Sequence, residues 1–97
     1  MTKEGILKIL RENKENFLNR YQISNIALFG SYARGENHQD SDIDIAIETT
    51  LTDYFKLYDF KEELEKFFKT KVDIVRLRDK MNKSLKKRIL NEGIYVW

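Results

Sequence analysis

A strict alternation of apolar and acidic or small side chains over residues 42–48 constrains the fold of this chain most strongly. On a β-strand, one face of this segment would hold Ile43, Ile45 and Ile47, and the other Asp42, Asp44, Ala46 and Glu48. One face must then be buried while the other presents two carboxylates side by side. Such carboxylates repel each other, and Mg²⁺ is the natural cation between them, because it binds through one or two carboxylates together with substrate phosphates.

The remaining periodicities predict an α/β (α+β) protein. The 97 residues suffice for one small domain, 1–97. Helices are expected from the N-cap Thr2 to about Arg20, over 53–69 with Thr52 as cap, and over 82–91, with Leu85 and Ile89 facing inward. Strands are expected over 23–29, 42–48 and 72–77, with a short final strand or extended tail over 94–97.

The helix predicted over 53–69 carries a broad apolar stripe. Its members are Tyr54, Leu57, Tyr58, Leu64, Phe67 and Phe68. We interpret these side chains as core first and as a partner surface second.

A turn that suits phosphate lies directly after the first predicted strand. Gly30-Ser31 can offer backbone N–H groups and a hydroxyl. If the first two strands pair in antiparallel fashion, this turn lies next to Asp42 and Asp44. The connecting loop is long for a hairpin and contains Arg34, so it is expected to be functional and to include a short helical turn after Gly30.

A third carboxylate, Asp73, interrupts the apolar strand over 72–77. If that strand pairs with the second one, Asp73 joins Asp42 and Asp44 on one face of the sheet. Three carboxylates make a two-metal site plausible, with Asp73 also accepting the proton of an attacking hydroxyl. Each of these features alone has an ordinary explanation. Asp42-x-Asp44 is typical of the solvent-exposed face of a strand, and Asp73 is typical of a charge that protects an edge strand from aggregation. Arg34 alone is typical of an arginine on the protein surface. Their combination favours phosphoryl chemistry.

Composition excludes several other classes of protein. Cysteine is absent and His38, interpreted as a solvated loop residue, is the sole histidine, which excludes disulfides and thiolate or multi-histidine zinc sites. No apolar run reaches the ~20 residues of a membrane span and no signal peptide is visible, so a cytoplasmic location is expected.

Charge is distributed unevenly along the chain. The net charge of +2 is too small to argue for nucleic acid. Residues 76–88 nevertheless hold seven basic side chains against one Asp, a local +6 that leaves −4 for the remainder. This stretch is interpreted as a solvated helix face, with attraction of triphosphate or of an acidic partner as the alternative.

These motifs resemble the minimal nucleotidyltransferases of the DNA polymerase beta superfamily. The family pattern of a Gly-Ser turn, Asp-x-Asp on the next strand and a later Asp is matched by Gly30-Ser31, Asp42-x-Asp44 and Asp73. The string GSYARGENHQDSDIDIAIE is similar to that of MntA-type antitoxins of HEPN/MNT toxin–antitoxin systems. The resemblance implies a small mixed sheet with helices packed on one face.

The resemblance also implies an activity and a partner. The activity is Mg²⁺-dependent transfer of AMP from ATP to a hydroxyl, with Asp42 and Asp44 binding two metal ions and Asp73 bridging one of them and acting as base. Gly30, Ser31, Arg34 and Ser41 would bind the nucleotide. The implied partner is a HEPN-type toxin, an all-helical ribonuclease encoded by the adjacent gene, which is silenced in a hetero-oligomer by adenylylation of a tyrosine.

Chain length favours a protein acceptor, because no residues remain for the second helical domain that encloses small-molecule acceptors. Two alternatives stay open at this point. One is neutralisation of the partner by binding alone. The other is nucleotidyl transfer to a small molecule or an RNA end, of which RNA would use the basic stretch 76–88 and bind with a strong salt dependence.

Overall fold

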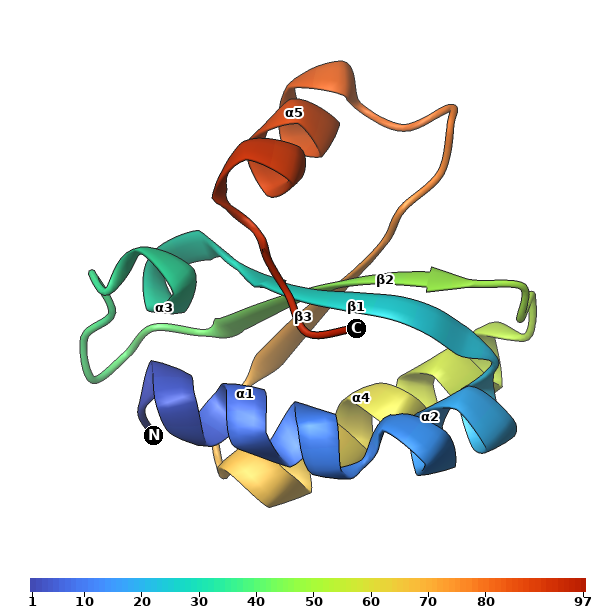
Figure 1. Cartoon of the computed structure of the whole chain (residues 1–97), viewed down its shortest axis with the longest axis horizontal. Coiled ribbons are helices and arrows are strands. Elements are labelled where there is room, and N and C mark those ends of the chain that lie inside the picture. Colours follow the sequence, from blue (N-terminus) through green and yellow to red (C-terminus); the bar gives the residue numbers. More distant parts are fainter.

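The computed structural model describes all 97 residues and contains one four-stranded mixed sheet (Figure 1). Its strands are β1 (Ile23–Phe29), β2 (Ile43–Thr49), β3 (Val72–Arg76) and β4 (Ile94–Tyr95), in the spatial order β3-β2-β1-β4. The inner strand β2 runs antiparallel to β1 and parallel to β3, and β4 runs antiparallel to β1. The predicted fold class and the predicted pairing of the first two strands are confirmed, and β3 forms one edge of the sheet.

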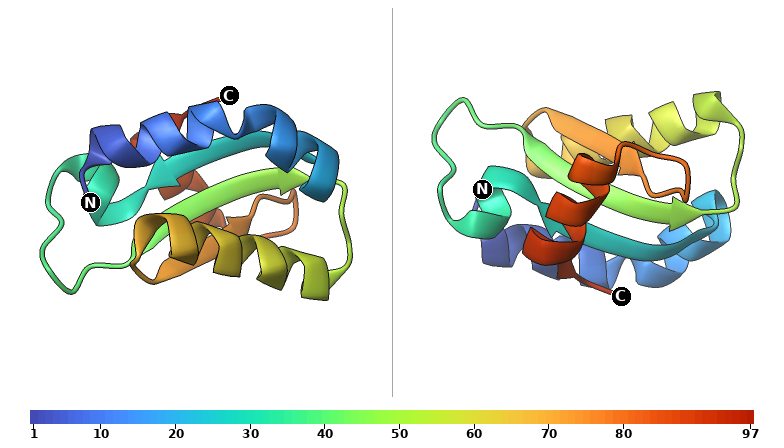
Figure 2. Two further views of the ribbon diagram at one scale, coloured as in Figure 1. Left: turned by 90° about the horizontal axis from the view of Figure 1, so that it is seen from below. Right: turned by 90° about the horizontal axis from the view of Figure 1, so that it is seen from above.

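Three helices cover one face of the sheet (Figure 2). These are α1 (Lys3–Glu12), α2 (Lys14–Tyr21) and α4 (Tyr54–Phe68). The isoleucines of β2 are fully buried beneath them, as the alternation predicted. Burial of each such side chain contributes about 1.5–3 kcal/mol, so this pattern fixes the face of β2 that meets the core.

The last helix departs from the expectation that the helices pack on one face. Helix α5 (Lys83–Glu92) lies on the opposite face, with the short α3 (Gly30–Arg34) at one end of the sheet (Figure 1). Ala27 and Ala46 are directly paired in the sheet, and their small side chains leave room for Ile89, which is fully buried against them. The inward position predicted for Ile89 is confirmed, and Leu85 packs half-buried on the same cluster.

The single N-terminal helix expected to reach Arg20 is wrong, because the helix breaks at Asn13. The Asn13 side-chain amide donates a hydrogen bond to the carbonyl of Ile9 at 2.8 Å, and the backbone N–H of Asn13 also bonds into the last turn of α1. Asparagine competes with helical backbone hydrogen bonds in this way and ends α1. The predicted cap at the other end is confirmed, since Thr2 Oγ1 accepts from the N–H of Gly5 at 3.1 Å.

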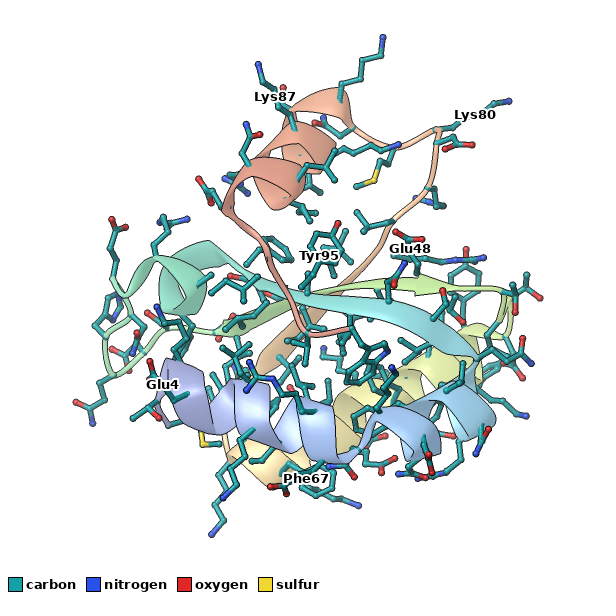
Figure 3. The ribbon with its side chains drawn as sticks, in the orientation of Figure 1. Glu4, Glu48, Phe67, Lys80, Lys87 and Tyr95 are labelled. Atoms are coloured by element: carbon teal, nitrogen blue, oxygen red, sulfur yellow. The ribbon has the colours of Figure 1, made fainter.

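Helix α4 differs from its prediction in its cap and in its buried face. Asp53, not Thr52, is the N-cap, and its carboxylate accepts from the N–H groups of Phe55 and Lys56. The fully or nearly fully buried positions of α4 are Phe60, Leu64 and Phe68. Of the predicted stripe, the aromatic side chains that are instead exposed are Tyr54, Tyr58 and Phe67, the last on the outer surface (Figure 3).

The other predicted elements begin and end within a residue or two of those observed, which is the usual disagreement at element ends. No helix has the length and apolar character that a membrane span requires.

Candidate active site

The turn after β1 depends on a glycine. Gly30 has a φ of 75°, a left-handed conformation that side chains with a Cβ rarely adopt. A Cβ at this position would also overlap the carboxylate of Asp44, coming to 2.9 Å from its Cγ. The sequence therefore places bare backbone directly against Asp44, and the predicted proximity of this turn to the Asp-x-Asp strand is present in the structure.

Three carboxylates lie on the sheet face opposite the main core. Asp44 and Asp73 are register partners on the adjacent parallel strands β2 and β3. Their backbones are therefore separated by the ordinary distance between neighbouring strands, about 4.7–4.9 Å. Asp42 directly precedes β2. Asp44 is half-buried, whereas Asp42 and Asp73 are exposed.

Asp44 experiences an unfavourable negative environment. Burial raises the pKa of Asp44 above its ordinary value, and the nearby carboxylates of Asp73 and Asp42 raise it further. The guanidinium groups of Arg88 and Arg34 act in the opposite direction. A cation at these carboxylates would relieve the repulsion that remains.

The carboxylates do not by themselves form a closed metal cage. No group of three acidic or histidine side chains in the structure is gathered closely enough to hold an ion. Mg²⁺ does not require such a cage, because it keeps several waters and commonly binds through one or two carboxylates plus substrate phosphates. The donor set of exposed and half-buried carboxylates thus fits an ion that arrives with a nucleotide.

All seven residues predicted for the site line one open cleft of about 410 Å³, which is within the range of small-molecule sites. They are Gly30, Ser31, Arg34, Ser41, Asp42, Asp44 and Asp73. They come from α3, the following loop, β2 and β3, so the topology of the sheet brings together segments up to 43 positions apart (30 to 73).

Two of these residues already have partners. The Arg34 guanidinium donates to Glu36 at 2.9 Å and to Glu92 of α5 at 3.0 Å, and these hydrogen bonds raise the pKa of Arg34. The Ser41 hydroxyl accepts from the N–H of His38 at 2.9 Å and so fixes the turn before β2. A bound phosphate would share the Arg34 guanidinium with the carboxylates of Glu36 and Glu92. It would also accept a hydrogen bond from the Ser41 hydroxyl, whose proton is not used in the bond from His38.

Arg88 also lies at the site, although it was not predicted individually from the sequence. Arg88 lines the cleft from α5 and is close enough to lower the pKa of Asp44. The neighbouring Ile89 is fully buried and anchors this turn of α5 on the sheet. The only signal in the sequence was the basic stretch 76–88, which does not distinguish Arg88 from its six basic neighbours. His38 lines the cleft too, although it is exposed as predicted.

Comparisons with known proteins show which family the chain is similar to. The sequence profile of the family "Polymerase beta, Nucleotidyltransferase" matches residues 8–97. A candidate protein adenylyltransferase of Methanocaldococcus jannaschii is 42% identical over 98 residues, covering 98% of each chain. The protein adenylyltransferase MntA of Thermococcus cleftensis is 33% identical over 97 residues, covering 99% of this chain and 97% of the relative.

Solved structures show the same fold in complexes. A chain of a toxin–antitoxin crystal structure with AMP-PNP matches with a TM-score of 0.73 and 31% identity, covering all of this chain and 73% of the other. A complex of tri-AMPylated Shewanella oneidensis HEPN toxin with MNT antitoxin contains a chain that matches with a TM-score of 0.64 and 30% identity, covering 93% of this chain and 71% of the other.

Proposed function

The chain belongs to the polymerase beta nucleotidyltransferase family, and from this membership we propose that it is an MntA-type protein adenylyltransferase that acts as an antitoxin. It transfers AMP from ATP to a hydroxyl, that of a tyrosine, on a HEPN-type toxin. The observation that carries the proposal is the meeting of the Gly30–Ser31 turn with the carboxylates of β2 and β3 in one cleft. The relatives of near-equal length are named as protein adenylyltransferases.

The triphosphate of ATP binds on the side of the cleft formed by α3 and α5. The backbone and hydroxyl of Ser31 and the hydroxyl of Ser41 donate to phosphate oxygens, and the absence of a side chain at Gly30 allows close approach. Arg34 and Arg88 offset the charge of the phosphates, which would otherwise be repelled by the three carboxylates.

Asp42, Asp44 and Asp73 are the residues that would hold Mg²⁺, and two ions are proposed. When bound, the metal supplies neutralisation of the charge that develops on the attacking and leaving oxygens. In the transfer, the acceptor oxygen bonds to the α-phosphorus of ATP while the bond from that phosphorus to pyrophosphate breaks. Asp73 is exposed and lines the cleft, so it can receive the proton of the attacking hydroxyl.

The proposed partner is a HEPN-type toxin encoded by the adjacent gene, held in a hetero-oligomer. Support comes from the similar chains, which were solved in toxin–antitoxin complexes, one with AMP-PNP and one with an AMPylated toxin. The open cleft also suits an acceptor that another protein completes. Because the reaction consumes ATP, we place it in the cytoplasm.

Intact-mass spectrometry of the chain mixed with the neighbouring toxin, ATP and Mg²⁺ tests the proposal. The toxin should gain one or more AMP units, and Asp42→Asn or Asp44→Asn should abolish the gain while both variants keep the wild-type circular dichroism spectrum. Asp73→Asn should still bind Mg-ATP but transfer little. A stable complex without any mass gain would instead indicate neutralisation by binding alone.

A further inference from the structure

A second hollow of about 630 Å³ runs along the open edge of β3, between α4 on one side and the start of α5 on the other. We call it the edge groove. Six of its lining residues define its character: Tyr54, Tyr58, Lys61, Ile74, Arg76 and Leu85. Figure 2 shows that β3 and α4 lie together at this side of the molecule, away from α1 and α2.

The edge groove and the nucleotide cleft meet at one residue. Asp73 lines both hollows, and no other residue does. It lies between the phosphate-binding turn on one side and the groove on the other. A molecule in the groove would therefore place its own groups beside the proposed catalytic base.

Resting on the proposed function, we infer that the edge groove binds the acceptor: an extended segment of the partner protein that carries the reacting hydroxyl between apolar and acidic side chains. This assignment gives each hollow one substrate. The nucleotide cleft takes the donor ATP, and the edge groove takes the acceptor segment, with Asp73 at their junction.

The aromatic side of the groove has no role in the core. Tyr54 and Tyr58 are 73% and 58% exposed, and their spacing of four residues places them on one face of α4. The core uses a different face of the same helix, that of Phe60 and Leu64. Exposed aromatic side chains that line a groove are typical contact residues for a protein partner.

The backbone of β3 favours an extended occupant. Lys71 and Leu77 bond to β2 through their backbone, so in a parallel ladder the alternate residues Ile74 and Arg76 direct their backbone groups to the open edge. The N–H of Val72, which also points outward, is bound by the Glu65 carboxylate at 2.9 Å. The open groups that remain can pair with an added strand.

Charge at the groove favours acidic flanks on the acceptor. Lys61, Arg76 and Arg78 line it, and none of them forms an ion pair within the chain. Asp73 is the only acidic lining residue. Lys80 and Lys87 project from the adjoining loop and from α5 (Figure 3) and extend the positive field.

The test measures AMP transfer to the purified toxin encoded by the adjacent gene, at varied toxin concentration and saturating Mg-ATP. The double variant Tyr54→Ala/Tyr58→Ala should raise the KM for the toxin at least about tenfold, as expected for loss of two anchoring aromatics. Its Kd for Mg-ATP, measured without toxin, should stay within about twofold of wild type. Phe55→Ala is the matched control, because Phe55 is 86% exposed on the same helix but lies outside the groove.

A second pair of variants tests the charge. Lys61→Glu should raise the KM for the toxin and should make that KM less dependent on salt concentration. Lys56→Glu should have neither effect, because Lys56 is exposed on α4 but lies outside the groove. The inference is overturned if the double tyrosine variant keeps the wild-type KM for the toxin, or if Phe55→Ala raises that KM equally. It is also overturned if the only change in the double tyrosine variant is a loss of self-association, measured by sedimentation velocity.

Failure of the proposed function gives a different result. In that case the wild-type chain itself adds no AMP to the toxin. The inference is then judged by direct binding of the same toxin to wild-type and variant chains, where an equal affinity of wild type and double tyrosine variant overturns it.

Discussion

Two glycines with the same backbone conformation provide a controlled test of the site. Gly30 and Gly35 have φ values of 75° and 72°. A Cβ added at Gly30 meets the Asp44 side chain, with 2.9 Å to its Cγ and 3.2 Å to its Cβ, whereas a Cβ added at Gly35 meets no atom within 4 Å. Alanine at either position carries the cost of a left-handed conformation, but only alanine at position 30 displaces Asp44.

The expected magnitudes follow from this difference. The left-handed conformation costs a residue with a Cβ about 1–2 kcal/mol, so Gly35→Ala should lose about that much free energy of unfolding, and Gly30→Ala at least as much because of the added overlap with Asp44. Each 1 kcal/mol corresponds to a fall in Tm of about 4–8 °C in a domain of this size. In Gly30→Ala the Asp44 carboxylate must also move by on the order of 1 Å, a displacement that can reduce the rate on the order of 10²-fold.

Thermal unfolding and AMP transfer should be measured on both variants below their melting temperatures. We expect Gly35→Ala to be less stable but active within a few-fold of wild type, and Gly30→Ala to be folded but about 10²-fold slower. The reasoning is refuted if the two variants lose activity equally, because the loss would then come from the backbone conformation and not from contact with Asp44.

Three further perturbations test the electrostatics and the core. Arg88→Gln should weaken Mg-ATP binding about 10- to 100-fold, which corresponds to the loss of a hydrogen bond to a charged group, and should leave stability nearly unchanged. An unaltered affinity for Mg-ATP in calorimetry would contradict the assignment of Arg88 to the nucleotide site. Burial and the hydrogen bond to Glu63 raise the pKa of Tyr21 from 10.0 to about 12, so the folded state holds the phenol proton more tightly and stability should fall as pH rises from 10 to 12. Urea unfolding of Tyr21→Phe should lack this component of the pH dependence. Phe60→Ala, at a fully buried position, should cost about 3–5 kcal/mol in the same assay, and a loss below 1 kcal/mol would contradict the assigned core.

The site was predictable to the extent that its geometry follows from strand periodicity. The period of two residues places Asp42 and Asp44 on one face and the isoleucines on the other, whatever the rest of the chain does. Asp73 required one further assumption, that its strand pairs with β2, and the observed register of Asp44 with Asp73 satisfies it. The roles of these residues stay predictions until the variants are measured.

The features that sequence reasoning missed depend on contacts between distant segments. Nothing local distinguishes Arg88 from the other basic residues of 76–88, because its position over Asp44 is set by Ile89 fitting against the paired Ala27 and Ala46. The same packing puts α5 on the second face of the sheet. The inward face of α5 followed from its periodicity, but a helix with a single buried residue gives no signal in the sequence for which side of the sheet it covers.

Helix α4 shows why an apolar stripe does not by itself distinguish core from binding surface. Its apolar residues cover more of its circumference than one contact with the sheet can bury, so some aromatic side chains must be left in water. The sheet selects Phe60, Leu64 and Phe68, and the position of β3 leaves Tyr54 and Tyr58 along the edge groove, which Asp73 also lines. An exposed aromatic face is costly to keep in water. Its placement along the open edge, in the groove that also reaches the proposed base, is the physical reason to interpret it as the surface that contacts the acceptor.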